Sequence, residues 1–269
     1  MDCANGASVS TAKKAFELFG GEVVVMNDQP DGYNINTKCG STHPEQLVQK
    51  VLELNADAGF AFDGDADRCI GVNHLGELVT GDDVLYLVGK YLKKNNKLKN
   101  NLVVTTVMAN LGLFRALERE GIDYRSTQVG DKYVFEVLGQ EDGVIGGEQS
   151  GHIIFKDIAH TGDGVLTALK LVEIMVHENK SLKELTNGLV IYPQTLKNLK
   201  VKDKQVVLED SSVNDLIAEI ETRLNKDGRI LVRPSGTEPL IRVMVEAKDQ
   251  LTCDSIVDEV IDYIVQRGY

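Results

Sequence analysis

One stretch of the chain combines an apolar strand with a charged loop: Ala58-Gly59-Phe60-Ala61-Phe62-Asp63-Gly64-Asp65-Ala66-Asp67-Arg68. The five apolar residues that open it predict a buried strand. The aspartates that follow occupy alternate positions, and the small residues between them let the backbone bend, so the carboxylates can converge on one hard cation. We therefore expect a metal site formed by Asp63, Asp65 and Asp67.

The aspartate loop could also be an EF-hand or a plain turn. An EF-hand loop has glycine at its sixth position and glutamate at its twelfth, but counting from Asp63 those positions hold Arg68 and His74. An EF-hand is therefore excluded. A solvated, aspartate-rich turn at the end of a strand stays open as the alternative.

Outward from this stretch, short β-branched runs alternate with longer stretches of helical period, which is typical of α/β units. Strands are expected at residues 23–26, 102–107, around 124, 144–145 and 153–155. Helices are expected at residues 11–19, 44–54, 82–92, 113–120, 133–138 and 163–177, the second of them opened by a capping box at 42–45. The pattern predicts an α/β fold.

The chain is expected to form three domains. A polar stretch at residues 93–101 and the dipeptide Tyr192-Pro193 mark the two boundaries, which gives domains at 1–98, 99–193 and 194–269. The last domain differs from the others, since it combines short strands near 199 and 206, a helix at 213–224, two strands flanking Pro234 and a closing helix to 266. We expect a small α+β domain there.

Composition excludes several classes of partner. The formal net charge of -12, from 41 acidic and 29 basic residues, repels nucleic acids and anionic membrane surfaces. No apolar run approaches the roughly 20 residues that span a membrane, and the first residues do not resemble a secretion signal. The four cysteines are scattered, which indicates reduced structural thiols. We therefore expect a cytoplasmic protein with no nucleic-acid or membrane partner.

A second motif, Arg233-Pro234-Ser235-Gly236-Thr237-Glu238-Pro239, lies between two apolar runs. Gly236 permits a backbone nest, Ser235 and Thr237 supply hydroxyl groups, and Arg233 supplies a planar guanidinium, which together suit the oxygens of a phosphate. Arg242 in the next apolar run is a further candidate contact. A plain β-turn is the alternative, although it would need neither the hydroxyls nor the arginine.

A third motif, Gly146-Gly147-Glu148-Gln149-Ser150-Gly151-His152, is rich in glycine and carries four different hydrogen-bonding side chains. Donors and acceptors in a flexible backbone suit the ring edges of a polyhydroxylated or amino sugar. A polar loop with an incidental histidine is the alternative. The nearby Val129-Gly130-Asp131-Lys132-Tyr133 places a cation beside a glycine and is a weak indication by itself.

Taken in order, these motifs resemble the α-D-phosphohexomutase family. They match its metal loop of Asp-Gly-Asp-x-Asp-Arg type, its sugar loop of Gly-Glu-x-Ser-Gly-His type and its phosphate loop of Arg-x-Ser-Gly-Thr-Glu-Pro type. The resemblance runs from Asp2-Cys3-Ala4-Asn5-Gly6 to the C-terminus. It implies two mixed α/β domains followed by a small α+β domain of the TATA-box-binding-like fold.

Within the family, Gln149 and the segments 106–112 and 130–133 are similar to the branch that acts on phosphoglucosamine. The implied activity is an intramolecular phosphotransfer that interconverts glucosamine 6-phosphate and glucosamine 1-phosphate through a bisphosphate intermediate, toward UDP-N-acetylglucosamine and the bacterial cell wall. Two alternatives stay open. The chain could be part of a phosphomannomutase or phosphoglucomutase, or a non-catalytic protein that binds phosphosugars.

The resemblance also implies roles for individual residues. Mg²⁺ would be held by the three aspartates with Arg68 alongside. Lys132 and His152 are candidates for proton handling or phosphate contact. The implied substrate contacts are Glu148, Gln149, Ser150, Arg233, Ser235, Gly236, Thr237 and Arg242.

Some features depart from the family pattern. Ala66 stands where glycine is common, a change that the loop should tolerate if the φ angle of Ala66 is negative. Lys132 stands where many relatives have arginine. No stretch matches the family's phosphoserine loop of Thr/Ala-Ser-His-Asn-Pro type, and Ser41-Thr42-His43-Pro44 is only a superficial echo. We therefore expect that the first domain is absent and that the 269 residues bind ligands without mutase activity of their own.

Overall fold

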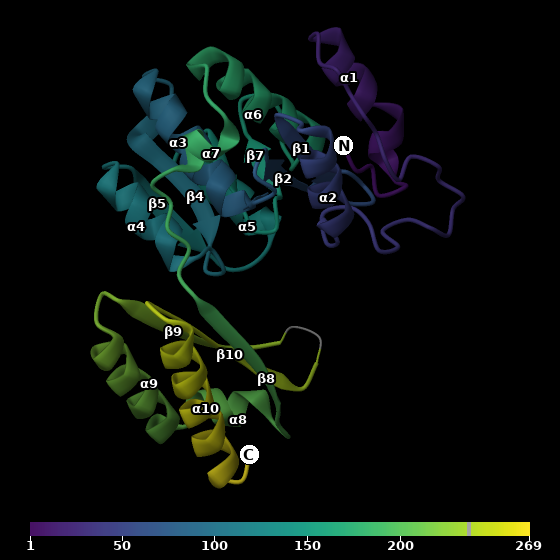
Figure 1. Ribbon diagram of the computed structural model, residues 1–269. Helices are drawn as coiled ribbons and strands as arrows, with labels where there is room; N and C mark the ends of the chain where they lie inside the picture. The colour runs from purple at the N-terminus through teal and green to yellow at the C-terminus, as the bar shows by residue number, and fades with distance from the viewer. Residues whose placement is uncertain (236–237) are drawn as a thin grey trace. The chain divides into compact units, whose positions relative to one another are not determined.

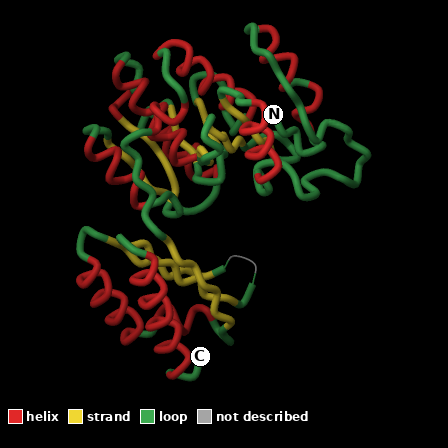
Figure 2. The backbone as a smooth tube through the Cα atoms, in the orientation of Figure 1, coloured by secondary structure: helices red, strands yellow, loops and turns green. Residues whose placement is uncertain are grey.

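The structure is a computed structural model that describes residues 1–235 and 238–269 (Figure 1). The chain divides into two compact units. The larger unit comprises Met1–Ala109 and Leu113–Leu189, and the smaller one comprises Asn110–Gly112 and Val190–Tyr269. Both units contain helices and strands (Figure 2). The predicted boundaries at residues 98 and 193 stay predictions.

The first part of the larger unit contains a three-stranded antiparallel sheet in the order β1-β2-β3. Strand β1 pairs with β2 from Ala58 opposite Asn73 to Phe62 opposite Cys69. The predicted buried strand is therefore present, and its end delivers the aspartate loop. The elements of this part are η1 (Ala7–Ser10), α1 (Ala12–Leu18), α2 (Glu45–Leu54), β1 (Ala58–Phe62), β2 (Cys69–Asn73), β3 (Leu78–Val79) and α3 (Gly81–Lys94).

Two local predictions in this part are wrong. Residues 23–25 form no strand, and Met26 pairs only through an isolated bridge with Asp2. Helix α2 has Pro44 as its N-cap without a side-chain hydrogen bond, so the capping box predicted at 42–45 is not formed. A side-chain bond of that kind lies instead at the start of α3, where Thr80 N donates to Asp83 Oδ2 at 2.8 Å.

The second sheet of the larger unit has the order β5-β4-β6-β7, with β4 parallel to β5 and β6, and β7 antiparallel to β6. Alternate residues of β4 face opposite sides of the sheet. Leu102 and Val104 pack with helix α5, and Val103 lies against Gly89 of α3. The elements are β4 (Leu102–Thr106), α4 (Leu111–Arg119), β5 (Asp123–Thr127), α5 (Asp131–Gln140), β6 (Ile145–Gly147), β7 (Ile153–Phe155), α6 (Gly164–Glu178) and α7 (Leu182–Thr186).

The smaller unit is an antiparallel sheet in the order β8-β10-β9 with α9 and α10 packed on it (Figure 1). Its core is formed by buried aliphatic residues of these strands and helices. The strand predicted near Val206 is wrong, because those residues form α8, which Asp203 opens by accepting from Gln205 N at 2.9 Å. The elements are β8 (Gln194–Lys200), α8 (Lys204–Glu209), α9 (Ser211–Leu224), β9 (Gly228–Pro234), β10 (Leu240–Ala247) and α10 (Gln250–Gln266).

Two predictions from composition can be compared with the structure. All four cysteines are buried and free of disulfides, as the sequence indicated. Among the described residues, no helix is both long enough and apolar enough to cross a membrane.

Candidate functional site

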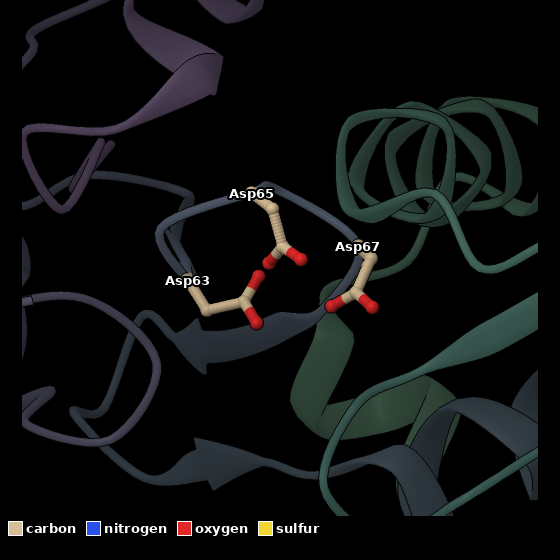
Figure 3. Close-up of side chains that lie close together, drawn as sticks. All are labelled: Asp63, Asp65 and Asp67. Atoms are coloured by element: carbon tan, nitrogen blue, oxygen red, sulfur yellow. The ribbon is translucent and has the colours of Figure 1, made fainter.

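The aspartate loop brings its three carboxylates together at the end of β1. One oxygen atom from each of Asp63, Asp65 and Asp67 lies within 4.8 Å of the other two. Figure 3 shows the three side chains turned toward one another inside a single tight loop. Asp63 is buried and Asp65 is exposed. The convergence predicted from their alternate spacing is therefore present, and the cluster is open to solvent on one side.

The surroundings of the cluster suit a cation. Burial, followed by the nearby Asp67, raises the pKa of Asp63, although Arg68 N donates to Asp63 Oδ1 at 3.1 Å. Among the described residues, Asp67 Oδ1 is buried without a hydrogen-bond donor. The Arg68 Nε atom lies 3.7 Å from Asp63 Oδ2 and 3.7 Å from Asp67 Oδ1. Clustered carboxylate oxygens are the ligands that Mg²⁺ and Ca²⁺ take, so the residues fit a divalent metal.

Ala66 departs from the prediction made for it. Its φ angle is +64°, in the left-handed region, so the condition of a negative φ is not met. A residue with a Cβ atom is strained there, whereas glycine is not. The loop adopts the conformation that glycine favours, and its neighbours hold it in place, since Gly164 N donates to Ala66 O at 2.9 Å.

His152 connects the third predicted loop to the metal cluster. Gly162 N donates to His152 Nε2 at 3.0 Å, so Nε2 is an acceptor and the proton lies on Nδ1. His152 Nδ1 then donates to Asp67 Oδ2 at 3.1 Å. His152 is only 4% exposed. His152 therefore orients the Asp67 carboxylate through its Nδ1 atom. Its predicted role in proton handling or phosphate contact stays a prediction.

Backbone contacts join the two loops as well. Cys69 N donates to Gly151 O at 3.1 Å, and Arg68 pairs with His152 in an isolated antiparallel bridge. A Cβ atom at Gly151, whose φ angle is +93°, would collide with the carbonyl oxygen of Cys69. Glycine is therefore required at this position for the sugar loop to lie directly against the metal loop.

Glu148 links the third loop to the segment at residues 129–133. Its Oε1 atom accepts from Gly130 N at 3.0 Å, and its Oε2 atom accepts from Ser150 Oγ at 3.5 Å. Lys132 follows Asp131, whose Oδ2 atom is 3.8 Å from His152 Nε2. The Lys132 side chain is 74% exposed, and its Nζ atom is 3.9 Å from Glu136 Oε1. The structure therefore joins Glu148 and Ser150 and leaves Lys132 on the surface.

The predicted phosphate loop lies in the smaller unit. Arg233 of β9 stands directly opposite Arg242 of β10, and burial together with this neighbouring charge lowers the pKa of Arg233. Arg242 Nε is buried without an acceptor among the described residues. Ser235 is buried and accepts from Glu238 N at 3.4 Å. Gly236 and Thr237 lie outside the described residues.

Comparison with known proteins places these loops in a family. Three family models match the chain in order: Phosphoglucomutase/phosphomannomutase alpha/beta/alpha domain II at residues 1–76, alpha/beta/alpha domain III at residues 80–192, and the C-terminal domain at residues 196–263. The chain belongs to the phosphoglucomutase/phosphomannomutase family. The resemblance predicted from the three loops is thereby confirmed.

Individual members of the phosphoglucomutase/phosphomannomutase family give the scale of the similarity. A phosphoglucosamine mutase of Lachnospira eligens is 51% identical over 269 residues, which is 100% of this chain and 60% of that protein. A phosphoglucomutase/phosphomannomutase family protein of Burkholderia thailandensis is 25% identical with a TM-score of 0.78, over 98% of this chain and 59% of that one. An N-acetylphosphoglucosamine mutase of Aspergillus fumigatus, solved with GlcNAc-6P and magnesium, has a TM-score of 0.78 at 21% identity, over 97% of this chain and 64% of that one.

Several residues that shape the sites of this family member were not found by sequence reasoning. Gly162 fixes the proton of His152, and the buried Asp82 accepts from Gln149 Nε2 at 3.1 Å. Lys204 Nζ donates to Ser235 O at 2.7 Å and to Glu238 O at 3.1 Å. These residues carry no motif, and only the fold brings them beside the loops.

Proposed function

We propose that this chain is the portion of a phosphoglucosamine mutase that binds the divalent metal, the amino sugar and a phosphate. The reaction would be the interconversion of glucosamine 6-phosphate and glucosamine 1-phosphate. The chain spans about 60% of the length of the curated relatives that it matches, and those relatives are named phosphoglucosamine mutases. The observation that carries the proposal is the direct attachment of the metal loop to the sugar loop through His152 and the 69–151 backbone contact.

Mg²⁺ is the metal that this proposal assigns to Asp63, Asp65 and Asp67. When bound, it would supply positive charge to neutralise a phosphoryl group in transfer. Arg68 lies close enough to two of the aspartates to balance their charge when no metal is bound. His152 Nδ1 donates to Asp67 Oδ2, and this bond fixes the Asp67 carboxylate near those of Asp63 and Asp65.

Glu148 and Ser150 are the residues that we assign to the sugar. Ser150 is exposed, and its hydroxyl donates to the Glu148 carboxylate, whose other oxygen is held by Gly130 N. A carboxylate fixed in this way can accept hydrogen bonds from sugar hydroxyls or from an ammonium group. Because the pair lies in the loop that contacts the metal loop, metal and sugar would bind in the same unit.

Arg233 and Arg242 are assigned to a phosphate. Two guanidinium groups on directly paired residues repel each other, and a bound anion would offset that repulsion. The burial of the Arg242 Nε atom without an acceptor among the described residues supports the same assignment. Ser235 and Thr237 keep their predicted roles as hydroxyl donors, as part of this proposal.

The test is a turnover assay followed by ³¹P NMR with glucosamine 6-phosphate, Mg²⁺ and a small amount of the 1,6-bisphosphate. It compares this chain alone with the same chain fused to the part of the Lachnospira eligens relative that this chain does not match. We expect binding without turnover for the chain alone, because it carries no match to the phosphoserine loop, and turnover for the fusion. A fusion that binds the sugar phosphate but never converts it would favour a non-catalytic binding protein.

A further inference from the structure

Gln149 faces a buried carboxylate in this structure. Its side-chain Nε2 donates to Asp82 Oδ2 at 3.1 Å, and its backbone carbonyl accepts from Gly81 N at 3.0 Å. Asp82 has no exposed surface and lies in the first turn of α3. The sugar loop is therefore fastened to the start of a 14-residue helix through both the backbone and the side chain of Gln149.

The attachment leaves little freedom between the helix and the loop. A hydrogen bond to a carboxylate is stronger than one between neutral groups, and exclusion of water strengthens it further. Gly81 adds a steric constraint, because a Cβ atom there would collide with the Glu148 carbonyl oxygen and lie 2.9 Å from Gly151 N. A shift of the loop along α3 would break both hydrogen bonds of Gln149.

The residues on either side of Gln149 are the ones assigned to the sugar. Glu148 is already held by Gly130 N, and Ser150 donates to Glu148. Groups that bind a ligand do so best when their own positions are fixed before the ligand arrives. The amide of Gln149 is the contact that fixes this pair from the side of α3.

We propose that Gln149 is a positioning residue that acts through Asp82, and that it does not select the substrate by contacting its 2-amino group. This inference rests on the proposed function, because it names how the sugar loop of that site is held. Loss of the bond to Asp82 then weakens the binding of amino sugars and neutral sugars alike.

A donor and acceptor exchange tests the proposal on the full chain. The variants are Gln149→Glu, Asp82→Asn and the double variant, all of which keep the side-chain lengths. Gln140→Glu, at the exposed end of α5, is the matched control for added charge. NMR titrations measure the dissociation constants for glucosamine 6-phosphate and glucose 6-phosphate with Mg²⁺, and hydrogen exchange measures the protection of the Gly81 amide.

The expected pattern follows from charge. Gln149→Glu places two carboxylates together, so both sugar phosphates bind about tenfold more weakly or worse, and the Gly81 amide exchanges faster. The double variant restores the affinity for both sugar phosphates and the protection of the Gly81 amide, because the new amide at position 82 donates to the new carboxylate at position 149. Gln140→Glu changes neither.

Two outcomes would overturn the proposal. Tighter binding of glucosamine 6-phosphate by Gln149→Glu, with glucose 6-phosphate unaffected, would show a direct contact with the amino group. A double variant that stays as weak as Gln149→Glu would show that the pair is not the cause. If the unmodified chain binds neither sugar phosphate, the proposed function fails, and the Gly81 exchange rates alone decide whether Gln149 holds the loop.

Discussion

Ala66 shows how a single residue can carry strain inside a functional loop. The alternation of aspartates with small residues was enough to predict that the carboxylates converge. The backbone angle of the residue between two of them was not predictable, because it depends on contacts from distant segments such as the Gly164 amide. The result is an alanine at φ +64°, which costs about 1–2 kcal/mol relative to a right-handed conformation.

Replacement of Ala66 by glycine is expected to stabilise the larger unit. Glycine relieves the strain but adds freedom to the unfolded chain, so the net gain in the free energy of unfolding should be about 0.5–1 kcal/mol. Urea denaturation measures it. Ala15→Gly, within helix α1, is the matched control and should lose about 1 kcal/mol. A loss of the same size at both positions would show that Ala66 is unstrained.

Arg242 gives a second prediction at the scale of the residue. Arg242→Met removes the charge opposite Arg233, so the smaller unit should become more stable by about 0.5 kcal/mol while phosphate binds at least tenfold more weakly. Urea denaturation and phosphate titration measure the two effects. Arg223→Met, which removes an exposed, paired arginine, is the control and should leave phosphate affinity unchanged. Unaltered phosphate affinity in Arg242→Met would remove Arg242 from the site.

At the scale of elements, periodicity predicted most helices and the strands that deliver the loops. It failed where local pattern and tertiary pairing differ. The β-branched residues 23–25 have a strand-like composition but find no partner strand, and Val206 lies in a short helix that Asp203 caps. Helix α3 was predicted from its apolar stripe. Its contact with the sugar loop could not be predicted, because it depends on the close approach of the Gly81 backbone to the Glu148 carbonyl oxygen, which only the folded chain brings together.

Gly81→Ala is expected to destabilise the chain even though alanine is the better helix former. The added Cβ atom would collide with the Glu148 carbonyl oxygen, and the forced shift should cost about 1–3 kcal/mol. Gly139→Ala in α5 is the matched control, because nothing lies within 4 Å of its Cβ position. That variant should gain up to about 1 kcal/mol from helix propensity alone. Thermal unfolding compares the two, and a stabilised Gly81→Ala would contradict the close approach of α3 and the loop.

At the scale of the whole molecule, the division into units does not follow the order of the sequence. The segment Asn110–Gly112 belongs to the smaller unit although it interrupts the larger one. Its attachment is the buried Glu246, which accepts from Asn110 Nδ2 at 3.1 Å, Leu111 N at 2.8 Å and Arg229 Nε at 2.6 Å. No local pattern predicts such a connection, because Asn110 and Glu246 lie 136 residues apart in the chain.

Glu246→Ala should therefore destabilise the smaller unit strongly. It removes the buried carboxylate that accepts from Asn110 Nδ2, Leu111 N and Arg229 Nε, and the loss of one member of a buried ion pair typically costs about 3–5 kcal/mol. Glu219→Ala, on the exposed surface of α9, is the control and should change stability by no more than about 0.5 kcal/mol. Chemical denaturation followed by circular dichroism measures both. Equal effects would mean that Glu246 does not hold the unit together.

The central claim is that the metal triad and the sugar loop form one binding site for an amino sugar phosphate. The most direct measurement is the paramagnetic relaxation that protein-bound Mn²⁺ causes in the sugar-ring protons of glucosamine 6-phosphate. We expect strong relaxation in the presence of the chain, and its loss when Asp63, Asp65 and Asp67 are all replaced by asparagine. Equal relaxation with the triple variant would place the metal elsewhere and would contradict the claim.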